Sequence, residues 1–533
     1  MTAYDYIVIG AGSAGCVVAG RLAEDRSARV LLLEAGTRNR TMLVSMPAGI
    51  AVTSLNRGPQ NWLFETEPEP HLDNRRLQCP RGRGIGGSSA INGMVYIRGA
   101  SQDYDQWRQM GLSGWGYEDV LPYFKKLERH VDGEGAYHGG SGPIRVRRAN
   151  DVNPLYDALI EAGRQAGYPV TSDFNGAQQE GFGRYDANIA KGRRCGPGAA
   201  FLSDPPPNLT IRTNARTTRL IIEKGRAVGV EFAGKGGVRE IVYADREIVL
   251  SAGTIQSPHI LQLSGVGDPD ALRAAGVTPI HELKGVGANL HDHLDVPVAY
   301  DCPEPVTMHS RTKGLKALGI GLDYLLFRKG PAGDAVCQVG AFLKSRPQID
   351  RPDMQCCIVT AAMKDNRLVP GYMFRICQLN PESRGRVDLR SADPFEAPKI
   401  LFNYLSTEAD RVALRGAVKV VRNVMSQGAV DRFRGYEIQP GSDVRTDDEI
   451  DAWVRATAVS DYHPVGTCRM GAAGDSMAVV DDQLRVVGLE GLRVADASVI
   501  PVIVSGNTNA PSMMIGEKCA DMIRTGAAVS LAA

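Results

Sequence analysis

A glycine-rich turn near the N-terminus limits this chain more than any other segment does. Residues 4–10 (YDYIVIG) form a short apolar run that ends in glycine, residues 13–25 follow with helical spacing, and residues 29–34 (RVLLLE) form a second apolar run. This order predicts a β-α-β unit. Because both apolar runs are continuous, we expect parallel strands in a sheet that is covered on both faces. The predicted fold class is therefore α/β.

The turn itself reads Gly10-Ala-Gly12-Ser-Ala-Gly15, directly after the first strand and at the start of the helix. The first glycine allows the tight turn, the second lets backbone N–H groups approach a pyrophosphate, and the third lets helix and strand pack closely. The phosphates then lie at the helix N-terminus, where the helix dipole and free N–H groups favour an anion. This segment predicts a dinucleotide site.

A carboxylate at the end of the second strand narrows the choice of dinucleotide. Glu34 follows the turn by about 20 residues, where it can accept hydrogen bonds from a ribose diol. An acidic residue there disfavours a 2′-phosphate and hence NADP, while NAD and FAD both remain open. The expected contacts from this unit are Gly10, Gly12, Ser13, Ala14, Gly15, Glu34 and Ala35.

Length and charge exclude several classes of protein. A chain of 533 residues exceeds one ordinary core, so we expect two connected domains or one α/β body with an added layer. The net charge of +1 gives no field that would recruit nucleic acid. There is no G-x-S-x-G elbow and no G-x-x-x-x-G-K-[ST] loop, so neither a hydrolase nor an NTPase is supported.

The expected location is the cytoplasm. The first residues leave no room for a signal peptide, and no apolar stretch reaches the ~18 residues that span a bilayer. Residues 315–329 (LKALGIGLDYLLFRK) form an amphipathic pattern, for which core packing is favoured and peripheral membrane contact stays open. The ten cysteines are interpreted as thiols, and Cys356-Cys357 as buried filler in an apolar strand.

Three further segments identify a family. They are residues 82–99, which begin GRGIGGSSAINGMVY, residues 253–267 (GTIQSPHILQLSGVG), and a C-terminal pair, YHPVGTCRMG at 462–471 with GNTNAP at 506–511. Together they resemble the glucose-methanol-choline (GMC) family of FAD-dependent oxidoreductases, in its choline dehydrogenase-like branch. The resemblance implies a Rossmann-like FAD-binding domain interleaved with an α+β substrate-binding domain built on an antiparallel sheet.

The same resemblance implies how the flavin is held. Glycines at 82–99 let the backbone press against an isoalloxazine ring, and the asparagine that matches Asn92 lies near its reactive edge in relatives. Some members attach FAD through a histidine, and the matching position here is Ile91, so we expect non-covalent FAD. Asp496 matches a cofactor contact, although a cap of a helix or turn is an equal alternative. The implied contacts are Gly86, Gly87, Ser88, Asn92, Gly93, Val95, Thr217, Asp496, Ala497, Asn507 and Thr508.

Alcohol oxidation needs a base near neutral pH, because a hydride leaves the carbon readily only when the hydroxyl proton is removed or polarised. Among nine histidines, the resemblance implies that His463 is this base and that Asn507 hydrogen-bonds the substrate oxygen. The expected partners are a small primary alcohol and a second acceptor, oxygen or a quinone. His291-Asp292-His293 also fits a metal site, but it lies in a segment similar to a family loop without one, so we expect no metal.

Five segments describe the expected domains. Residues 1–150, 206–298 and 451–533 build the FAD-binding domain, and 151–205 and 299–450 build the substrate-binding domain. Two other functions stay as alternatives. A hydroxynitrile lyase of the same family keeps FAD without net redox, and a scaffold with a vestigial site is disfavoured because both His463 and Asn507 are present.

Overall fold

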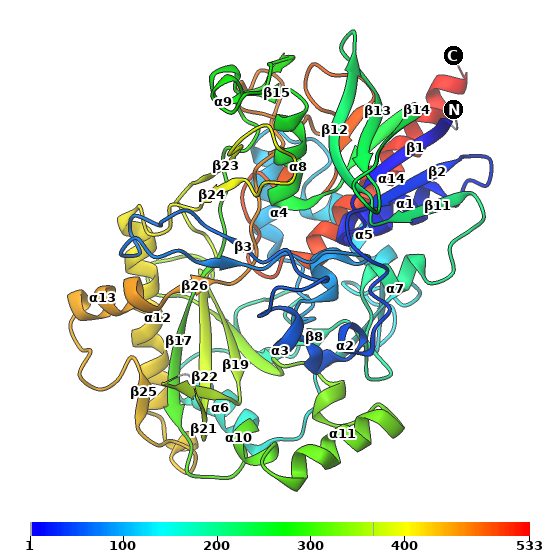
Figure 1. Ribbon diagram of the computed structural model, residues 1–533. Coiled ribbons are helices and arrows are strands. Elements are labelled where there is room, and N and C mark those ends of the chain that lie inside the picture. Colours follow the sequence, from blue (N-terminus) through cyan, green and yellow to red (C-terminus); the bar gives the residue numbers. More distant parts are fainter. Residues whose placement is uncertain (1–2, 366, 533) are drawn as a thin grey trace.

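A seven-stranded sheet, largely parallel, carries the N-terminal glycine turn. The computed structural model describes residues 3–365 and 367–532 (Figure 1). Residues 1, 2 and 533, which belong to the expected FAD-binding segments, lie outside the described residues. In spatial order the parallel strands are β11 (Leu209–Thr213), β2 (Val30–Glu34), β1 (Ala3–Ile9), β14 (Arg239–Leu250) and β27 (Leu492–Val494).

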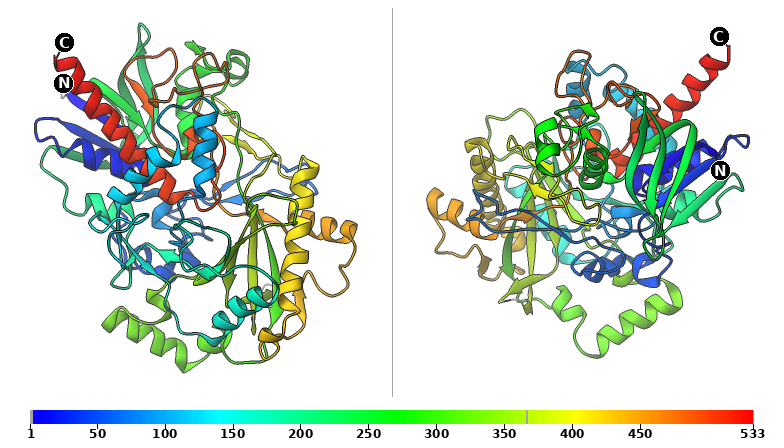
Figure 2. Two further views of the ribbon diagram at one scale, coloured as in Figure 1. Left: turned by 180° about the vertical axis from the view of Figure 1, so that it is seen from behind. Right: turned by 45° about the horizontal axis from the view of Figure 1, so that its top comes forward.

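The apolar runs of the sequence form the centre of this sheet. Val30, Leu31 and Leu32 are fully buried, as are Ile7 and Val8 on the neighbouring strand. Helix α1 (Ser13–Leu22) begins directly after β1, and the C-terminal helix α14 (Asn509–Ala532) packs against it (Figure 2). Chain ends distant in sequence therefore build one nucleotide-binding layer, and the α/β prediction is confirmed.

A hairpin extends the sheet beyond β14. Strands β12 (Arg216–Glu223) and β13 (Arg226–Ala233) pair antiparallel and meet at Lys224-Gly225, where both residues have positive φ. Residues 210–233 alternate in the sequence like a β-hairpin with Lys224-Gly225 at its turn, and this prediction is right about the turn. It is wrong for residues 210–213, which pair with β2 as part of β11, because a buried edge of the parallel sheet was available to them.

The second large sheet has seven strands and is antiparallel throughout. Helix α12 (Glu408–Met425) packs on β17 and β22, and its buried side chains recur every three or four residues, which is the pattern of a helix with one apolar face. The predicted antiparallel substrate sheet is thereby confirmed. Its strands are β25 (Glu437–Gln439), β17 (Leu294–Asp301), β22 (Gly371–Gln378), β19 (Met354–Val359), β18 (Val339–Leu343), β7 (Gly181–Arg184) and β26 (Val459–Ser460).

Shorter elements connect the two sheets. The remaining helices are α2 (Met42–Ser45), α3 (Ile50–Thr53), α4 (Ser101–Gln109), α5 (Tyr117–Leu127), α6 (Pro154–Gln165), α7 (Pro197–Leu202), α8 (Gly253–Leu263), α9 (Pro269–Ala274), α10 (Met308–Arg311), α11 (Leu315–Phe327) and α13 (Asp447–Thr457). The 3-10 turns are η1 (Pro47–Gly49), η2 (Gly87–Ala90), η3 (Pro331–Gly333), η4 (Gly428–Val430) and η5 (Ala497–Val499). The minor strands are β3 (Phe64–Glu65), β4 (Gln78–Cys79), β5 (Glu128–His130), β6 (Ile144–Arg148), β8 (Asp186–Ala187), β9 (Ile189–Ala190), β10 (Arg193–Arg194), β15 (Val266–Gly267), β16 (His281–Glu282), β20 (Ala362–Lys364), β21 (Arg367–Val369), β23 (Arg386–Asp388) and β24 (Lys399–Leu401).

The five-segment domain division stays a prediction. Strand β7 of the antiparallel sheet comes from the expected insertion at 151–205. Strand β17 runs across the expected boundary at residue 298, and β26 comes from the expected last FAD-binding segment. The chain thus passes repeatedly between the two sheets.

Two local expectations are wrong. Helix α11 does not pack into the core, because most of its apolar side chains are exposed. Not every cysteine is a thiol, because Cys337 forms a disulfide with Cys357, which lies on β19 and is only half-buried. Its neighbour Cys356 is a buried thiol, as expected.

Candidate active site

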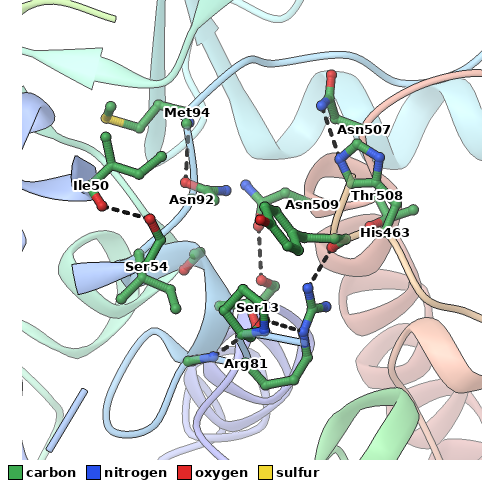
Figure 3. Close-up of a pocket in the computed structure, with 18 of the residues that line it drawn as sticks. Ser13, Ile50, Ser54, Arg81, Asn92, Met94, His463, Asn507, Thr508 and Asn509 are labelled. Carbon is green, nitrogen blue, oxygen red and sulfur yellow. Dashed lines mark hydrogen bonds between the residues drawn. The ribbon is translucent and has the colours of Figure 1, made fainter. Parts of the chain in front are cut away.

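A cavity of about 740 Å³ is lined by residues of both large sheets. Ile9 and Leu33 come from the parallel sheet, and Gln355 and Met373 come from the antiparallel sheet. His463 and Asn507 line the same cavity, and their side chains point toward one another (Figure 3). The cavity therefore joins the nucleotide loop to the proposed base.

The three glycines of the loop each meet the requirement expected of them. Gly10 has φ +95°, a left-handed turn. A Cβ on Gly15 would lie 1.9 Å from the Gly10 carbonyl oxygen, so only glycine allows this close packing. A Cβ on Gly12 would meet nothing nearer than the Ser251 carbonyl oxygen at 3.8 Å, and Gly12 lines the cavity. The backbone at Gly12 is thus open to a ligand.

Glu34 holds two loops as well as lining the cavity. Its Oε2 accepts a hydrogen bond from the Ala11 N–H (2.9 Å), and its Oε1 accepts from the Gly36 and Gly84 N–H groups (2.7 and 2.8 Å). The carboxylate therefore connects the first glycine loop to the second one at residues 82–99.

The second loop rests directly on the first. A Cβ on Gly87 would lie 2.7 Å from the Gly12 Cα, so the two backbones touch. Further along, the buried Arg194 donates from Nη1 to the Oδ1 and carbonyl oxygen of Asn92 (2.6 and 2.7 Å). Burial lowers the pKa of Arg194 to about 9, and the guanidinium also donates to the carbonyl oxygens of Val44 and Ser89. Arg194 fixes the orientation of Asn92.

Most predicted contacts line the cavity, and Gly15 and Gly86 do not. Gly15 instead allows the packing described above, and the Gly86 N–H donates to the Ala11 carbonyl oxygen (2.8 Å). The predicted residues found in the cavity wall are Gly10, Gly12, Ser13, Ala14, Glu34, Ala35, Gly87, Ser88, Asn92, Gly93, Val95, Thr217, Asp496, Ala497, Asn507 and Thr508.

Unpaired polar atoms show that this wall suits a polar cofactor. Thr217 Oγ1, Ser251 Oγ, Gln355 Oε1 and Asn509 Nδ2 are buried, line the cavity and have no hydrogen-bond partner among the described residues. A buried polar atom without a partner costs roughly 1–3 kcal/mol. A dinucleotide with ribose, ribityl or ring oxygens offers the missing partners, so these residues fit FAD.

Asp496 lines the cavity and also caps local structure. Its Oδ1 accepts from the Ser498 N–H (2.8 Å) at the start of η5, and its Oδ2 accepts from the Gly253 N–H (2.8 Å) at the start of α8. The capping alternative is therefore observed. Its contact with a cofactor stays a prediction.

A chain of hydrogen bonds fixes the tautomer of His463. The His293 Nε2 lies 3.2 Å from the Leu379 carbonyl oxygen, an obligate acceptor, so Nε2 carries the proton and Nδ1 has a lone pair. The Nδ1 atoms of His463 and His293 lie 3.0 Å apart, so His463 donates from Nδ1. The Nε2 of His463 is then unprotonated and carries a lone pair.

Asn507 faces that lone pair. Its Nδ2 lies 3.0 Å from His463 Nε2, and its Oδ1 accepts from the Gln355 Nε2–H (3.0 Å). Gln355 therefore turns the amide so that the NH₂ group, and not the oxygen, points to the histidine. Nε2 and Nδ2 are thus an acceptor and a donor that bond each other, and a ligand oxygen that contacts both has to replace this hydrogen bond.

The electrostatic surroundings keep His463 neutral. Burial, and secondarily the positive charge of Arg81, lowers its pKa from 6.5 to about 3. Tyr462, the preceding residue, has φ +66°, and Arg81 Nη2 donates to its carbonyl oxygen (2.6 Å). The left-handed conformation of a bulky residue is strained, and this contact holds the turn that presents His463.

The His291-Asp292-His293 segment builds the support for this turn. Asp292 accepts from the His463 N–H (2.7 Å) and the Tyr404 hydroxyl (2.7 Å). The His291 Nε2 accepts from the Ile503 N–H (3.0 Å), and Nδ1 lies 2.6 Å from the Asn289 carbonyl oxygen. All three side chains have protein partners, which favours the loop interpretation over the metal alternative.

Another group of residues brings metal-type ligand atoms together. His130, His138 and Asp186 place such atoms within 4.8 Å of one another, outside the cavity wall. Although burial lowers the pKa of His138, hydrogen bonds with Asp173 and Glu128 raise it to about 9. Both ring nitrogens of His138 therefore carry protons, and none is free for a metal. The expectation of no metal stays a prediction.

Several residues of the site were not predicted from the sequence. Gln355, Arg194 and Arg81 stand in no pattern that marks them. Asp292 and His293 were noticed only as possible metal ligands, and the H-x-H spacing was the one available signal. Their positions in the site depend on the pairing of strands that are distant from one another in the sequence.

Fold and site together define a dinucleotide-dependent redox enzyme, since a phosphate-binding turn and a neutral, oriented histidine share one cavity. Models of the GMC oxidoreductase family match residues 4–295 and 381–516. The chain belongs to the GMC oxidoreductase family.

Similar proteins cover nearly the whole chain. An oxygen-dependent choline dehydrogenase of Vibrio vulnificus (strain YJ016) is 45% identical over 528 residues, which are 98% of this chain and 94% of the relative. The mitochondrial choline dehydrogenase of Homo sapiens is 45% identical over 534 residues, which cover 98% and 90%.

Solved structures agree with this family. Pyridoxine 4-oxidase from Mesorbium loti superposes with a TM-score of 0.89 at 31% identity, covering 98% of this chain and 99% of that one. Formate oxidase gives a TM-score of 0.93 at 27% identity, covering 98% of each chain. The protein is an FAD-dependent oxidoreductase that acts on CH–OH groups. Over the described residues, no helix is long and apolar enough to cross a membrane.

Proposed function

We propose that this enzyme oxidises a primary alcohol to an aldehyde, with His463 as the base that accepts the hydroxyl proton. The observation that carries the proposal is the unprotonated His463 Nε2, whose lone pair accepts a hydrogen bond from Asn507 Nδ2 at 3.0 Å. An alcohol hydroxyl that replaces this hydrogen bond would give its proton to Nε2, and its oxygen would accept a hydrogen bond from Asn507. That amide then stabilises the negative charge that develops on the oxygen.

FAD, when bound, supplies the acceptor for the hydride. The residues proposed to hold it are those of the two glycine loops with Glu34, Thr217, Asp496, Ala497, Asn507 and Thr508. The binding is proposed to be non-covalent, because Ile91, which lines the cavity, offers no nucleophile at the position where some family members carry the attaching histidine. The electron acceptor is proposed to be oxygen or a quinone.

Choline is the first substrate to test. The relatives named choline dehydrogenase support it, and a carboxylate is present for a quaternary ammonium group, since Asp461 lines the cavity and its Oδ2 lies 3.4 Å from His463 Nδ1. The position of the carboxylate would let an amino alcohol place its hydroxyl at Nε2. The proposed location in the cytoplasm stays a prediction.

The test is anaerobic mixing of the FAD-loaded enzyme with choline, pyridoxine or a simple aliphatic alcohol while flavin absorbance is followed. Choline should bleach the flavin, and admitting oxygen or a quinone afterwards identifies the acceptor. His463→Ala should retain FAD and slow the bleaching by roughly 10²-fold or more, whereas the control His71→Ala, at an exposed position, should leave it unchanged.

Two results would contradict the proposal. If His463→Ala bleaches at the rate of the unmodified enzyme, His463 is not the base. If no alcohol reduces the flavin while a cyanohydrin is cleaved, the lyase alternative replaces alcohol oxidation.

A further inference from the structure

Helix α11 presents a row of leucines to solvent. Leu315, Leu318, Leu322, Leu325 and Leu326 are between 52% and 84% exposed. At 3.6 residues per turn, these five positions lie within about 100° of one another around the helix axis. The buried Tyr324 lies on the opposite side, so the body of the protein contacts one face and the leucine row is the other.

The helix stands at the periphery of the molecule. In both views of Figure 2 it projects beyond the two sheets, and Figure 1 shows it at the lower edge. An exposed apolar row of this kind is costly in water, since each buried leucine would be more stable by about 1.5–3 kcal/mol. The row is therefore expected to be covered by a partner.

The charges around the row are positive. Lys313 precedes α11, Lys316 lies in its first turn and Lys329 follows it, and all three are exposed and form no ion pair with any described residue. Asp323 is the one acidic residue of α11. Two copies of this face would bring their lysines together and repel, whereas a surface that carries negative charge would neutralise them. The charge pattern thus favours an anionic partner over a second copy.

The helix also borders the entrance of the catalytic cavity. Ile320, on the side of α11 next to Tyr324, lines the cavity, as does Pro331 just beyond the helix. Leu55, which follows α3, lines it too and is 58% exposed, so the cavity reaches the surface there. Whatever covers the leucine row lies beside this entrance.

We propose that α11 docks on the surface of an anionic lipid bilayer. The leucine row enters the boundary between headgroups and acyl chains, and Lys313, Lys316 and Lys329 contact lipid phosphates. The helix has 13 residues, about 20 Å, which is shorter than the ~30 Å apolar core of a bilayer. It therefore lies on the membrane with the cavity entrance beside the lipid.

The test is sedimentation of the full-length, FAD-loaded enzyme with vesicles of phosphatidylcholine, with and without phosphatidylglycerol. The unmodified enzyme should sediment with the anionic vesicles and be released by salt. The triple variant Leu318→Ser, Leu322→Ser, Leu326→Ser should lose at least about tenfold in partitioning. Lys313→Glu with Lys316→Glu should abolish the preference for phosphatidylglycerol.

A matched control removes exposed apolar side chains elsewhere. Val238→Ser with Ile241→Ser, at the β13–β14 turn and the start of β14, should bind vesicles as the unmodified enzyme does. Flavin content and turnover of a soluble alcohol should be the same in all variants, since none of these residues lines the cavity.

Two outcomes overturn the inference. One is equal sedimentation of the unmodified enzyme and the triple leucine variant. The other is an absence of vesicle binding together with a dimer, seen by analytical ultracentrifugation, that the leucine variant dissociates, because the row would then cover a second copy.

Discussion

At the scale of single residues, the geometry around His463 explains how a histidine is prepared as a base. The Leu379 carbonyl oxygen, His293, His463 and Asn507 form one hydrogen-bond chain. Each member determines where the next one carries its proton. The Leu379 carbonyl oxygen, on the far side of His293, therefore determines that Nε2 of His463 is unprotonated. The tautomer is therefore set before the alcohol binds, and the alcohol has to replace only the hydrogen bond between His463 Nε2 and Asn507 Nδ2.

His293 is therefore a positioning residue, and its replacement gives a first prediction. His293→Leu removes the acceptor for the His463 Nδ1–H, and flavin reduction should slow by roughly 10- to 100-fold, the cost of one unmet buried hydrogen bond. His293→Gln keeps an acceptor and a donor and should recover most of the rate. Stopped-flow reduction of both variants measures this, and equal rates for Leu and Gln would argue against it.

The low pKa of His463 predicts the pH dependence. A folded-state pKa near 3 keeps the ring neutral and able to accept a proton well below pH 6.5. The acidic limb of kcat/KM should therefore lie below pH 6.5. The same shift costs stability, because between pH 6.5 and about 3 the unfolded chain binds a proton that the folded ring does not. A pH profile of flavin reduction checks the first statement, and an acidic limb at 6.5 or above would contradict it.

At the scale of elements, the turn between β1 and α1 separates two uses of glycine. Gly12→Ala should fold normally, because its φ of −78° is ordinary and its Cβ would point into open space. The added methyl group lies where a pyrophosphate would approach, so the affinity for FAD should fall by roughly tenfold or more. Titration of the apo-protein with FAD, followed by flavin fluorescence, measures this change.

Gly15→Ala is the matched comparison on the same turn. Its Cβ would lie 1.9 Å from the Gly10 oxygen, so α1 must move away from β1 and the free energy of unfolding should fall by about 1–3 kcal/mol or more. Thermal unfolding without FAD distinguishes the two variants. Equal loss of apo-protein stability in both would contradict the separate uses assigned to these glycines.

At the scale of the whole molecule, the cofactor cavity is where the two sheets meet. Since segments from both line it, FAD should act as a shared core. Removing it should lower the midpoint of thermal unfolding, and saturating FAD should restore about 4 kcal/mol at 1,000 times its Kd. FMN, which lacks the adenosine half, should restore less, because the site around Glu34 stays unfilled. If FMN raised the midpoint of thermal unfolding as much as FAD does, the first glycine loop would not contribute to the stabilisation by the cofactor.

The sequence by itself determined the local parts of this protein. The β-α-β unit and the Lys224-Gly225 turn were predicted because apolar periodicity and turn residues act within a few positions of one another. The segments that resemble the GMC family likewise predicted the FAD cofactor and the roles of His463 and Asn507.

Only the tertiary structure decided the contacts between distant segments. The place of residues 210–213 in the parallel sheet, the exposure of α11 and the Cys337–Cys357 pairing depend on which surfaces are free after folding. The same holds for the proton on His463, which is set by His293, 170 residues away. Local propensity does not contain such information, because burial and hydrogen-bond partners across a cavity are properties of the assembled chain.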